Sequence, residues 1–468
     1  MRGIWAARVT RTVGLTLALA LPVACGGGGG GGTTTTASTG TSTGTSTSTS
    51  GGTSTSTGTT TGTSTGSTTG STSGSTGTGG TTGTTPTTTP TGCVSGTVTP
   101  VVGTTPISQL PLAQRPGALA AALGRPKRLL VGVGTTEISV VQAQGLQVEI
   151  YDQYLNGVGT DSWLSWNSPS GEYAQVVARN ADCIGATPMY TVYQMAARGE
   201  GNMEVLRDWA FMKDYWNTLR VLYQQIAKYG KPALVNLEPD LWGYTQRVSR
   251  TDPTRQFVQV YDAAAPLNDD CVGLGNDVAG MAQCMVRMAR KYAPNAYVGF
   301  PPSLFGDNEP TELAYFKAIG ADKADFVVMQ TLDRDIGCIE AQYTANSANC
   351  ARPANAFNLK IWDETNTTSP NFREHFALAR SYFESLGLPI LWWQTPLGVA
   401  AATAGGSANQ FRDNRVRYFL THGSELVNAG GLGVVFGQGH TSQTTLTTDG
   451  GQFRSFLTQY RASPASLP

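Results

Sequence analysis

Charged and aromatic side chains are missing from a long N-terminal part of this chain. Residues 26–92 contain no charged and no aromatic residue, and almost every position is Gly, Thr or Ser. Such a segment cannot bury enough apolar surface to offset the entropy lost on folding, so we expect a disordered linker. As a flexible tether its root-mean-square reach is about 45 Å.

Histidine, metal-ligand spacings and excess charge are scarce as well. The 468 residues include three histidines and no CxxC or HxxxH spacing, so we expect neither a metal nor another cofactor. Lysine and arginine number 32 against 32 acidic residues, which provides no basic surface for nucleic acid. After the leader, no apolar stretch is long enough to span a bilayer. Residues 93–468 also lack the GxSxG motif, which excludes a typical α/β-hydrolase nucleophile.

Residues 1–24 are predicted to be a secretory signal peptide, because three arginines precede a short apolar run that ends in small residues. The end of this run, Leu-Pro-Val-Ala-Cys25, resembles a bacterial lipoprotein processing site. This resemblance implies that Cys25 becomes the first residue and carries lipid, palmitate included. Secretion with cleavage nearby is the alternative. Gly26 is not acidic, which favours an anchor in the outer membrane, facing the periplasm or the cell surface.

Residues 93–468 hold the folded part, with a length that is ordinary for one decorated α/β barrel. No break in composition divides it. Apart from Cys25 there are six cysteines, and an even count in an exported protein favours disulfides over a metal site. The pairings that we favour are Cys93 with Cys183, Cys271 with Cys284, and Cys338 with Cys350. Other connectivities stay open.

Eight short apolar runs recur in this part, several of them nearly continuous, as expected for strands covered on both faces. They lie at 129–133, 148–151, 188–193, 233–237, 296–300, 326–330, 390–393 and 433–436. Helical patterns occur at 172–180, 206–229, 278–292, 312–319, 371–386, 413–428 and 452–460. The alternation predicts a (β/α)8 TIM barrel preceded by the disordered linker. A doubly wound sheet is the runner-up, but the glycine-rich turn after the first strand is incomplete.

The run at 233–237 has the most informative ending. Glu238, Pro239 and Asp240 stop the strand, because proline cannot donate to a strand ladder. In an α/β barrel, the carboxyl ends of the strands hold the active site. Glycoside cleavage needs one protonated carboxyl and a second that attacks or activates water. We therefore expect Glu238 to be the catalytic acid, with an ion pair that locks the barrel mouth as the alternative.

Several carboxylates compete for the second role. Asp240 is either the partner of Glu238 or a helix cap. Asp333 has the better position among the others, just past a strand end. Glu364 lies beside Asp363 in a loop, where a solvated turn is the alternative. Asp152, at the end of the second strand, is expected to bind substrate.

Aromatic rings offer flat apolar surfaces on which sugars stack, and amides orient their hydroxyl groups. The substrate-binding candidates are Asp152, Tyr193, Trp242, Trp393, Gln394, Gln438 and His440, with Tyr154 and Trp362 as further stacking rings. Core packing is the alternative for the tryptophans. A surface position is the alternative for His440.

The glutamate at the end of the fourth strand resembles that of the (β/α)8 glycoside hydrolases. In many of these, Asn-Glu-Pro ends strand four and a nucleophilic Glu ends strand seven. Here Asn236-Leu-Glu-Pro239 contains an extra residue, and Gln394 stands at the end of strand seven. Leu237-Glu-Pro-Asp240 also resembles the motif of an inverting cellulase family, which implies that Asp240 donates the proton and Glu238 supports it. No specific family is identified.

Together these features predict an exported, lipid-anchored monomer that cleaves a polysaccharide by carboxylate general acid/base catalysis. It is expected to contact the membrane only through its lipid. The alternative is a non-catalytic surface protein that binds a glycan on the same face, which the missing strand-seven Glu favours. A polysaccharide lyase or a deacetylase is a second alternative, although three scattered histidines argue against a metal-dependent deacetylase.

Overall fold

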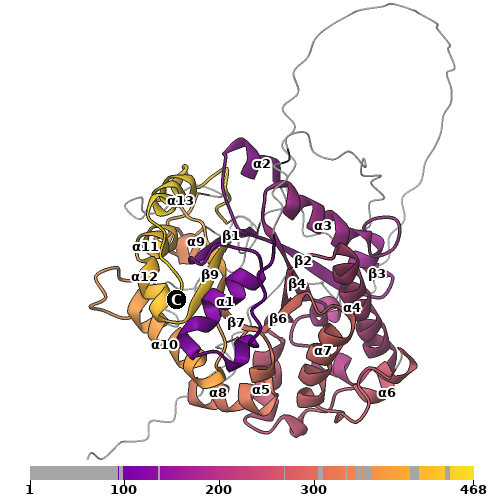
Figure 1. Ribbon diagram of the computed structural model, residues 1–468. Helices are drawn as coiled ribbons and strands as arrows, with labels where there is room; N and C mark the ends of the chain where they lie inside the picture. The colour runs from indigo at the N-terminus through magenta and orange to yellow at the C-terminus, as the bar shows by residue number, and fades with distance from the viewer. Residues whose placement is uncertain are drawn as a thin grey trace, which may run out of the picture. The chain divides into compact units, whose positions relative to one another are not determined.

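Eight parallel strands close into a barrel, with the helices outside it (Figure 1). The computed structural model describes residues 93, 99–134, 138–267, 269–303, 309–331, 336–343, 350, 361–400, 410–437 and 443–468. The strands follow the order β1-β9-β8-β7-β6-β5-β4-β2, and β1 pairs with both β9 and β2. Closure leaves no free sheet edge among these eight strands. The predicted (β/α)8 fold is therefore confirmed.

The strands lie where the apolar runs predict them. They are β1 Leu130–Gly134, β2 Ile150–Val158, β4 Thr187–Tyr193, β5 Ala233–Leu237, β6 Ala296–Phe300, β7 Phe326–Gln330, β8 Ile390–Pro396 and β9 Gly431–Gly437. The main difference is β2, which extends well beyond its apolar run and forms an antiparallel hairpin with the short β3, Asp161–Ser162. Polar residues in this extension hide it from a search for apolar runs.

Each of the seven predicted helical patterns contains a helix, and five further helices among the described residues were not predicted. In chain order the helices are α1 Arg115–Ala122, α2 Ile138–Ala143, α3 Glu172–Cys183, α4 Trp209–Tyr229, α5 Leu241–Ser249, α6 Tyr261–Ala264, α7 Val278–Tyr292, α8 Glu309–Ala318, α9 Ile336–Glu340, α10 Phe372–Leu386, α11 Arg415–Thr421, α12 Gly423–Asn428 and α13 Gln452–Ala462. The five without a predicted pattern are α1, α2, α5, α6 and α9. The single helix expected at 413–428 is divided at His422 into α11 and α12. None of the described helices is long and apolar enough to cross a membrane.

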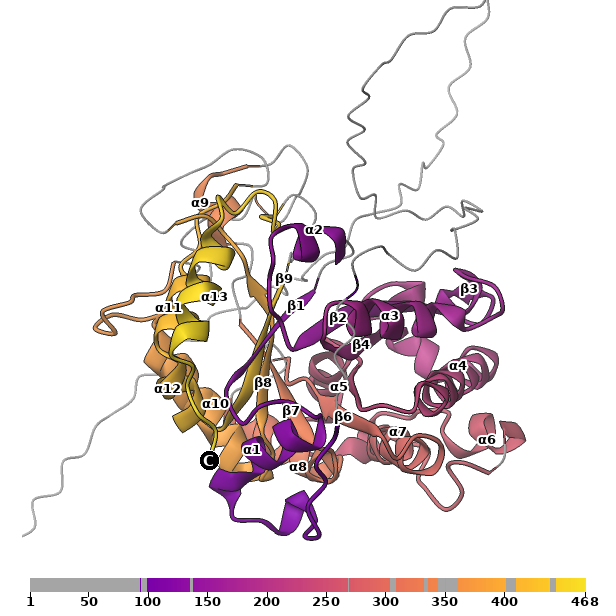
Figure 2. The same cartoon turned by 45° about the horizontal axis from the view of Figure 1, so that its top comes forward.

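Helix α1 closes the amino end of the barrel, which the sequence did not predict. Leu119 and Leu123 are fully buried in one cluster with Leu130 and Ile150, which lie near the starts of β1 and β2. Leu467, near the end of the chain, belongs to the same cluster. Figure 2 shows α1 at one end of the barrel and α9 toward the other. The amino end is thus sealed by apolar packing, which leaves the carboxyl end for a site.

The barrel interior is filled by side chains rather than open. Phe326 and Val328 of β7 lie in the same buried cluster as Leu234 of β5. Between these strands, a Cβ atom at Gly299 of β6 would lie 2.5 Å from the Phe326 ring. Only glycine fits there, because the large ring occupies the space of the missing side chain.

Three disulfides connect the cysteines as expected. Cys93 pairs with Cys183, Cys271 with Cys284, and Cys338 with Cys350. The first joins the start of the folded part to the end of α3 across 90 residues of sequence. It is therefore the one that removes most entropy from the unfolded chain.

Replacing Leu119 with alanine should lower the free energy of unfolding by about 2–5 kcal/mol, because it opens a cavity between α1 and the strands. Urea denaturation followed by tryptophan fluorescence measures the loss. Leu112→Ala, at a half-buried position before α1, is the matched control and should cost less. Equal losses in the two variants would contradict a sealing role for α1.

Candidate functional site

An acidic side chain lies inside the barrel, near the carboxyl ends of the strands. Asp152 of β2 is 4% exposed. Its carboxylate accepts a hydrogen bond from the Thr191 hydroxyl of β4 at 2.7 Å and another from the indole N–H of Trp393 of β8 at 2.8 Å. Burial raises the pKa of Asp152 to about 6, although both hydrogen bonds oppose this shift. Trp393 thus reaches across the barrel from β8 to β2, and it is 1% exposed.

Asn236 of β5 continues this polar network. Its side-chain amide donates a hydrogen bond to the Thr191 hydroxyl at 3.3 Å. Its side-chain oxygen is buried and has no hydrogen-bond partner among the described residues. The connected polar groups therefore run from β2 through β4 to β5, two residues before Glu238.

Three rings form an aromatic strip above the network: Trp393, Tyr154 and Tyr193. The ring centroids of Trp393 and Tyr154 are 5.8 Å apart, and those of Tyr154 and Tyr193 are 6.0 Å apart. Both tyrosines are half-buried, so they carry the exposed part of the strip. The Gln394 amide donates a hydrogen bond to the Tyr154 hydroxyl. The structure therefore brings together Asp152, Tyr193, Trp393 and Gln394, four predicted residues from three strands.

Glu238 is fully buried rather than open to the barrel mouth. Its carboxyl accepts hydrogen bonds from the backbone N–H groups of Gln194, at 3.2 Å, and Met195, at 3.1 Å. Burial raises the pKa of Glu238 to about 8, while these N–H groups and the nearby Tyr215 hydroxyl oppose the shift. The side chain is thus a protonated link between the end of β5 and the turn after β4 at neutral pH. It has no exposed surface from which to contact a substrate.

A small pocket lies next to this link, and we call it the Asp240 pocket. Its lining is Tyr193, Met195, Ala196, Glu200, Gly201, Met203, Pro239, Asp240, Leu241 and Tyr244. Asp240 is half-buried and precedes α5 without capping it through its side chain. Tyr193 belongs both to the pocket and to the aromatic strip, so the two features form one continuous region.

The backbone is strained at three of the predicted site residues. The φ values are 57° at Glu238, 70° at Asp240 and 51° at Gln394. They lie in the left-handed region, which residues other than glycine rarely adopt. All three follow the ends of barrel strands or lie within their last residues. Such strain persists where the surrounding structure imposes it, and it is concentrated at functional sites.

Two predicted residues lie away from this region. Trp242 is fully buried against Phe300, with a centroid distance of 4.9 Å, and its indole N–H donates to the Leu237 carbonyl at 2.8 Å. Core packing, the alternative reading, describes its environment. Glu364 forms an ion pair with Arg417 of α11, among the outer helices. Its neighbour Asp363 accepts hydrogen bonds from the threonines that follow it, as in a local turn.

Asp333, Gln438, His440 and Cys25 lie outside the described residues. Their predicted roles in catalysis, substrate binding and lipidation therefore stay predictions. Among the residues that the structure does describe, no group of three or more His, Cys, Asp or Glu side chains is placed to hold a metal ion.

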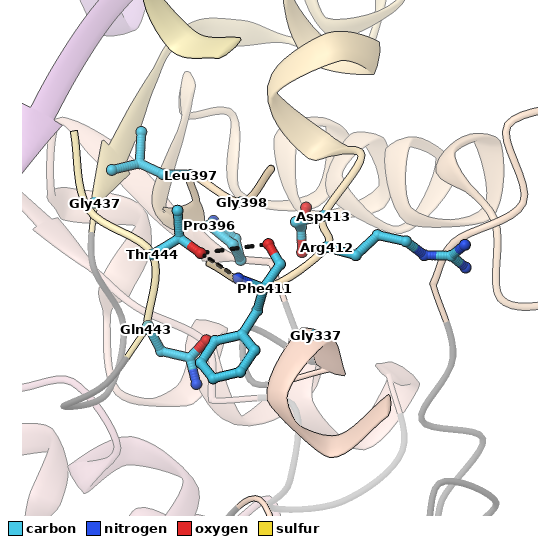
Figure 3. Close-up of a pocket in the computed structure, with 10 residues that line it drawn as sticks. All are labelled: Gly337, Pro396, Leu397, Gly398, Phe411, Arg412, Asp413, Gly437, Gln443 and Thr444. Carbon is cyan, nitrogen blue, oxygen red and sulfur yellow. Dashed lines mark hydrogen bonds between the residues drawn. The ribbon is translucent and has the colours of Figure 1, made fainter. Parts of the chain in front are cut away.

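A second small hollow lies at the carboxyl ends of β8 and β9 (Figure 3). Its polar lining is bonded within the protein. The Thr444 hydroxyl accepts from the Phe411 N–H at 2.9 Å, Arg412 pairs with Glu340 at 3.0 Å, and Asp413 pairs with the buried Arg415. These contacts explain the lining as a support for the loops after β8, so we assign the candidate site to the Asp240 pocket and the aromatic strip.

Thr191, Asn236 and Glu200 also lie at the site, although none of the three was predicted from the sequence. Asn236 was recognisable, since strand alternation places it on the same inward face of β5 as Leu234, and a polar residue there is unusual. Glu200 carries no comparable pattern, because it lies on a loop between two glycines. Its place in the pocket depends on the folded path of that loop.

No protein-family model matches this chain, and no curated protein matches it either. Solved structures with a similar arrangement include an endo-β-1,4-mannanase from Thermotoga petrophila, with a TM-score of 0.38 and 11% identity over 73% of this chain and 77% of that one. A β-mannanase from a symbiotic protist of the termite Reticulitermes speratus has a TM-score of 0.38 and 10% identity over 76% and 95%.

D-psicose 3-epimerase from Clostridium cellulolyticum H10 is also similar, with a TM-score of 0.34 and 11% identity over 71% of this chain and 99% of that one. Glycoside hydrolases and a sugar epimerase thus occur together among these neighbours.

The buried carboxyl of Glu238 should make stability fall as the pH rises. The folded state keeps a proton up to a pH of about 8, whereas the unfolded chain releases it near the usual value of 4.5. Between these values the free energy of unfolding should drop by up to about 1.4 kcal/mol per pH unit. Urea denaturation from pH 5 to pH 8 measures the slope.

Glu238→Gln is the matched variant, because its amide oxygen accepts the same N–H bonds and does not titrate. We expect the variant to gain stability relative to the parent as the pH rises. Asp152 is present in both proteins, so its own titration cancels in the difference. A difference that stays constant across this range would contradict the protonated link.

Proposed function

We propose that this domain binds a polysaccharide along the aromatic strip and hydrolyses a glycosidic bond in the Asp240 pocket. The observation that carries the proposal is the continuity of the two features through Tyr193. The half-buried Tyr154 and Tyr193 provide aromatic rings on which sugars can stack. The half-buried carboxyl of Asp240 follows β5, at the end of the barrel where barrel enzymes hold catalytic groups.

Asp240 is the proposed proton donor in place of Glu238. A general acid has to reach the leaving oxygen, and Asp240 lines the pocket whereas Glu238 is sealed beneath it. This assignment agrees with the role that the resemblance to the inverting cellulase motif implies for the two residues. Glu238 would act as a support, because its carboxyl fixes the backbone of Gln194 and Met195, the start of the pocket wall.

A non-catalytic glycan-binding protein is the second candidate. Gln394 favours this candidate, because it lies near the end of β8, the seventh strand of the barrel, where many barrel glycosidases carry the nucleophile. Its side-chain amide instead donates a hydrogen bond to the Tyr154 hydroxyl. The aromatic strip would serve a binding protein equally well. The two candidates differ in whether bound polymer is cleaved.

Replacing Asp240 with asparagine should lower kcat on a cleaved polymer by about 10²–10⁴-fold, the usual contribution of a general acid. Reducing-end release from a panel of β- and α-linked polysaccharides measures the effect on residues 93–468. Glu384→Gln, at an exposed position on α10, is the control and should match the parent. Retention of a polymer in affinity electrophoresis without cleavage by the parent would instead support the binding protein. Full activity in Asp240→Asn would remove Asp240 from the mechanism.

We also propose that the chain is exported and held at the outer membrane by lipid on Cys25, as a monomer on the linker of residues 26–92. The linker composition and the Leu-Pro-Val-Ala-Cys25 sequence support this proposal. A flexible tether would let the barrel reach polymer at a distance from its anchor.

Replacing Cys25 with alanine should abolish incorporation of labelled palmitate when the whole chain is expressed in a Gram-negative bacterium. The acyl anchor needs the thiol, so the protein should also leave the membrane fraction, as an immunoblot would show. Thr33→Ala, within the linker, is the control. Equal labelling of Cys25→Ala and the control would contradict lipidation at this residue.

A further inference from the structure

The Asp240 pocket contains a second carboxylate that lies on a different loop. Glu200 and Asp240 both line it, Glu200 from the segment between β4 and α4 and Asp240 from the end of β5. We infer that Glu200 is the general base that activates water opposite Asp240. This inference rests on the proposed hydrolysis and names the partner that the hydrolysis requires.

The loop that carries Glu200 has a shape that glycine imposes. Gly199 and Gly201 flank the residue and have φ values of 104° and 73°, which other residues rarely adopt. A Cβ atom at Gly201 would lie 2.8 Å from the Tyr244 ring, another wall of the pocket. The close approach of this backbone to Tyr244 therefore fixes where Glu200 enters the pocket.

Contacts outside the pocket hold the same loop in place. The Asn202 amide donates to the Arg198 carbonyl at 3.1 Å, and its side-chain oxygen accepts from the Glu204 N–H at 3.2 Å. Arg198 pairs with Asp208 at 2.5 Å and lies 5.0 Å from the Phe211 ring centroid. A carboxylate on a loop braced from both sides can be positioned for catalysis.

Glu238, Asp152 and Glu364 do not line this pocket. Glu238 is sealed under the Gln194 and Met195 backbone, and Asp152 accepts from Thr191 and Trp393 inside the barrel. Glu364 is paired with Arg417. Of the described residues, Glu200 and Asp240 are the two acids that line this pocket.

The proposed step is balanced in atoms and charge. The Glu200 carboxylate takes a proton from a water molecule, whose oxygen bonds to the anomeric carbon. The bond from that carbon to the leaving oxygen breaks, and the Asp240 carboxyl gives its proton to this oxygen. The products are two polymer fragments. A proton then passes from Glu200 through solvent to Asp240, which restores both carboxyl groups to their starting states.

The test compares Glu200→Gln with the parent on the polymer that the parent cleaves. We expect kcat to fall by about 10²–10⁴-fold, with circular dichroism unchanged. Glu204→Gln, an exposed glutamate in the next turn, is the matched control and should keep full activity. Glu200→Asp retains a carboxylate and should be faster than Glu200→Gln. A role that depended only on the length of the side chain would predict the opposite order.

A dinitrophenyl glycoside of the released sugar separates the two acids. Its leaving group departs without protonation, so Asp240→Asn should recover activity on it whereas Glu200→Gln should not. Nuclear magnetic resonance of the first product should show inversion at the anomeric carbon.

Full activity of Glu200→Gln on the polymer would overturn the role of Glu200 and leave the proposed hydrolysis intact. Recovery of Glu200→Gln on the dinitrophenyl glycoside, or a product of retained configuration, would overturn its role as a base. If Glu200→Gln does not fold, the Glu200→Asp and Glu200→Ala variants replace it. Parental activity in Glu200→Asp, together with full activity in a folded Glu200→Ala, would overturn the inference. A parent that cleaves none of the polymers overturns the hydrolysis itself.

Discussion

The hydrogen bonds from the Gln194 and Met195 N–H groups to the buried Glu238 carboxyl are the contact on which the candidate site depends. They join the end of β5 to the turn after β4, and both segments line the Asp240 pocket. Because the carboxyl is buried and holds its proton up to a pH of about 8, the link carries little charge at neutral pH. It can therefore persist without a cation to neutralise it.

The same link accounts for the strained backbone beside it. Glu238 and Asp240 both have positive φ values, with Pro239 between them, so the chain turns sharply as β5 ends. A side chain that follows the alternation of β5 would point into the barrel, like Leu234 and Asn236. The turn instead places Glu238 against the β4 turn and lets Asp240 line the pocket. Strain at these positions is thus the cost of presenting one carboxyl and burying the other.

The sequence was a good guide to the strands and an incomplete guide to the site, for different physical reasons. Apolar runs such as β5, β6 and β7 are continuous because both faces of each strand are buried, so they stand out in a single sequence. The side chain of Glu238 points where it does because its φ is positive, and that of Trp242 because its indole N–H donates to the Leu237 carbonyl. The spacing of residues along the sequence predicts neither direction. Glu200 joins Asp240 only because a glycine loop and a strand end meet in the folded chain. By contrast, the strand alternation of β5 is sufficient to place Asn236 on the inward face beside Leu234.

The two ends of the barrel differ in how fully their buried polar groups are hydrogen-bonded. At the amino end, the buried Glu149 is bonded by Arg128, Arg461 and the Val131 N–H, while α1 packs over the opening. At the carboxyl end, the Gln194 amide, the Asn236 side-chain oxygen and the Thr395 hydroxyl are buried without a hydrogen-bond partner among the described residues. An unpaired buried polar atom is costly, so its persistence needs a reason. Gln194, Asn236 and Thr395 are fully buried, so their unpaired atoms lower stability at the end of the barrel that carries the candidate site. The apolar packing of α1 and the bonded Glu149 at the amino end offset that loss.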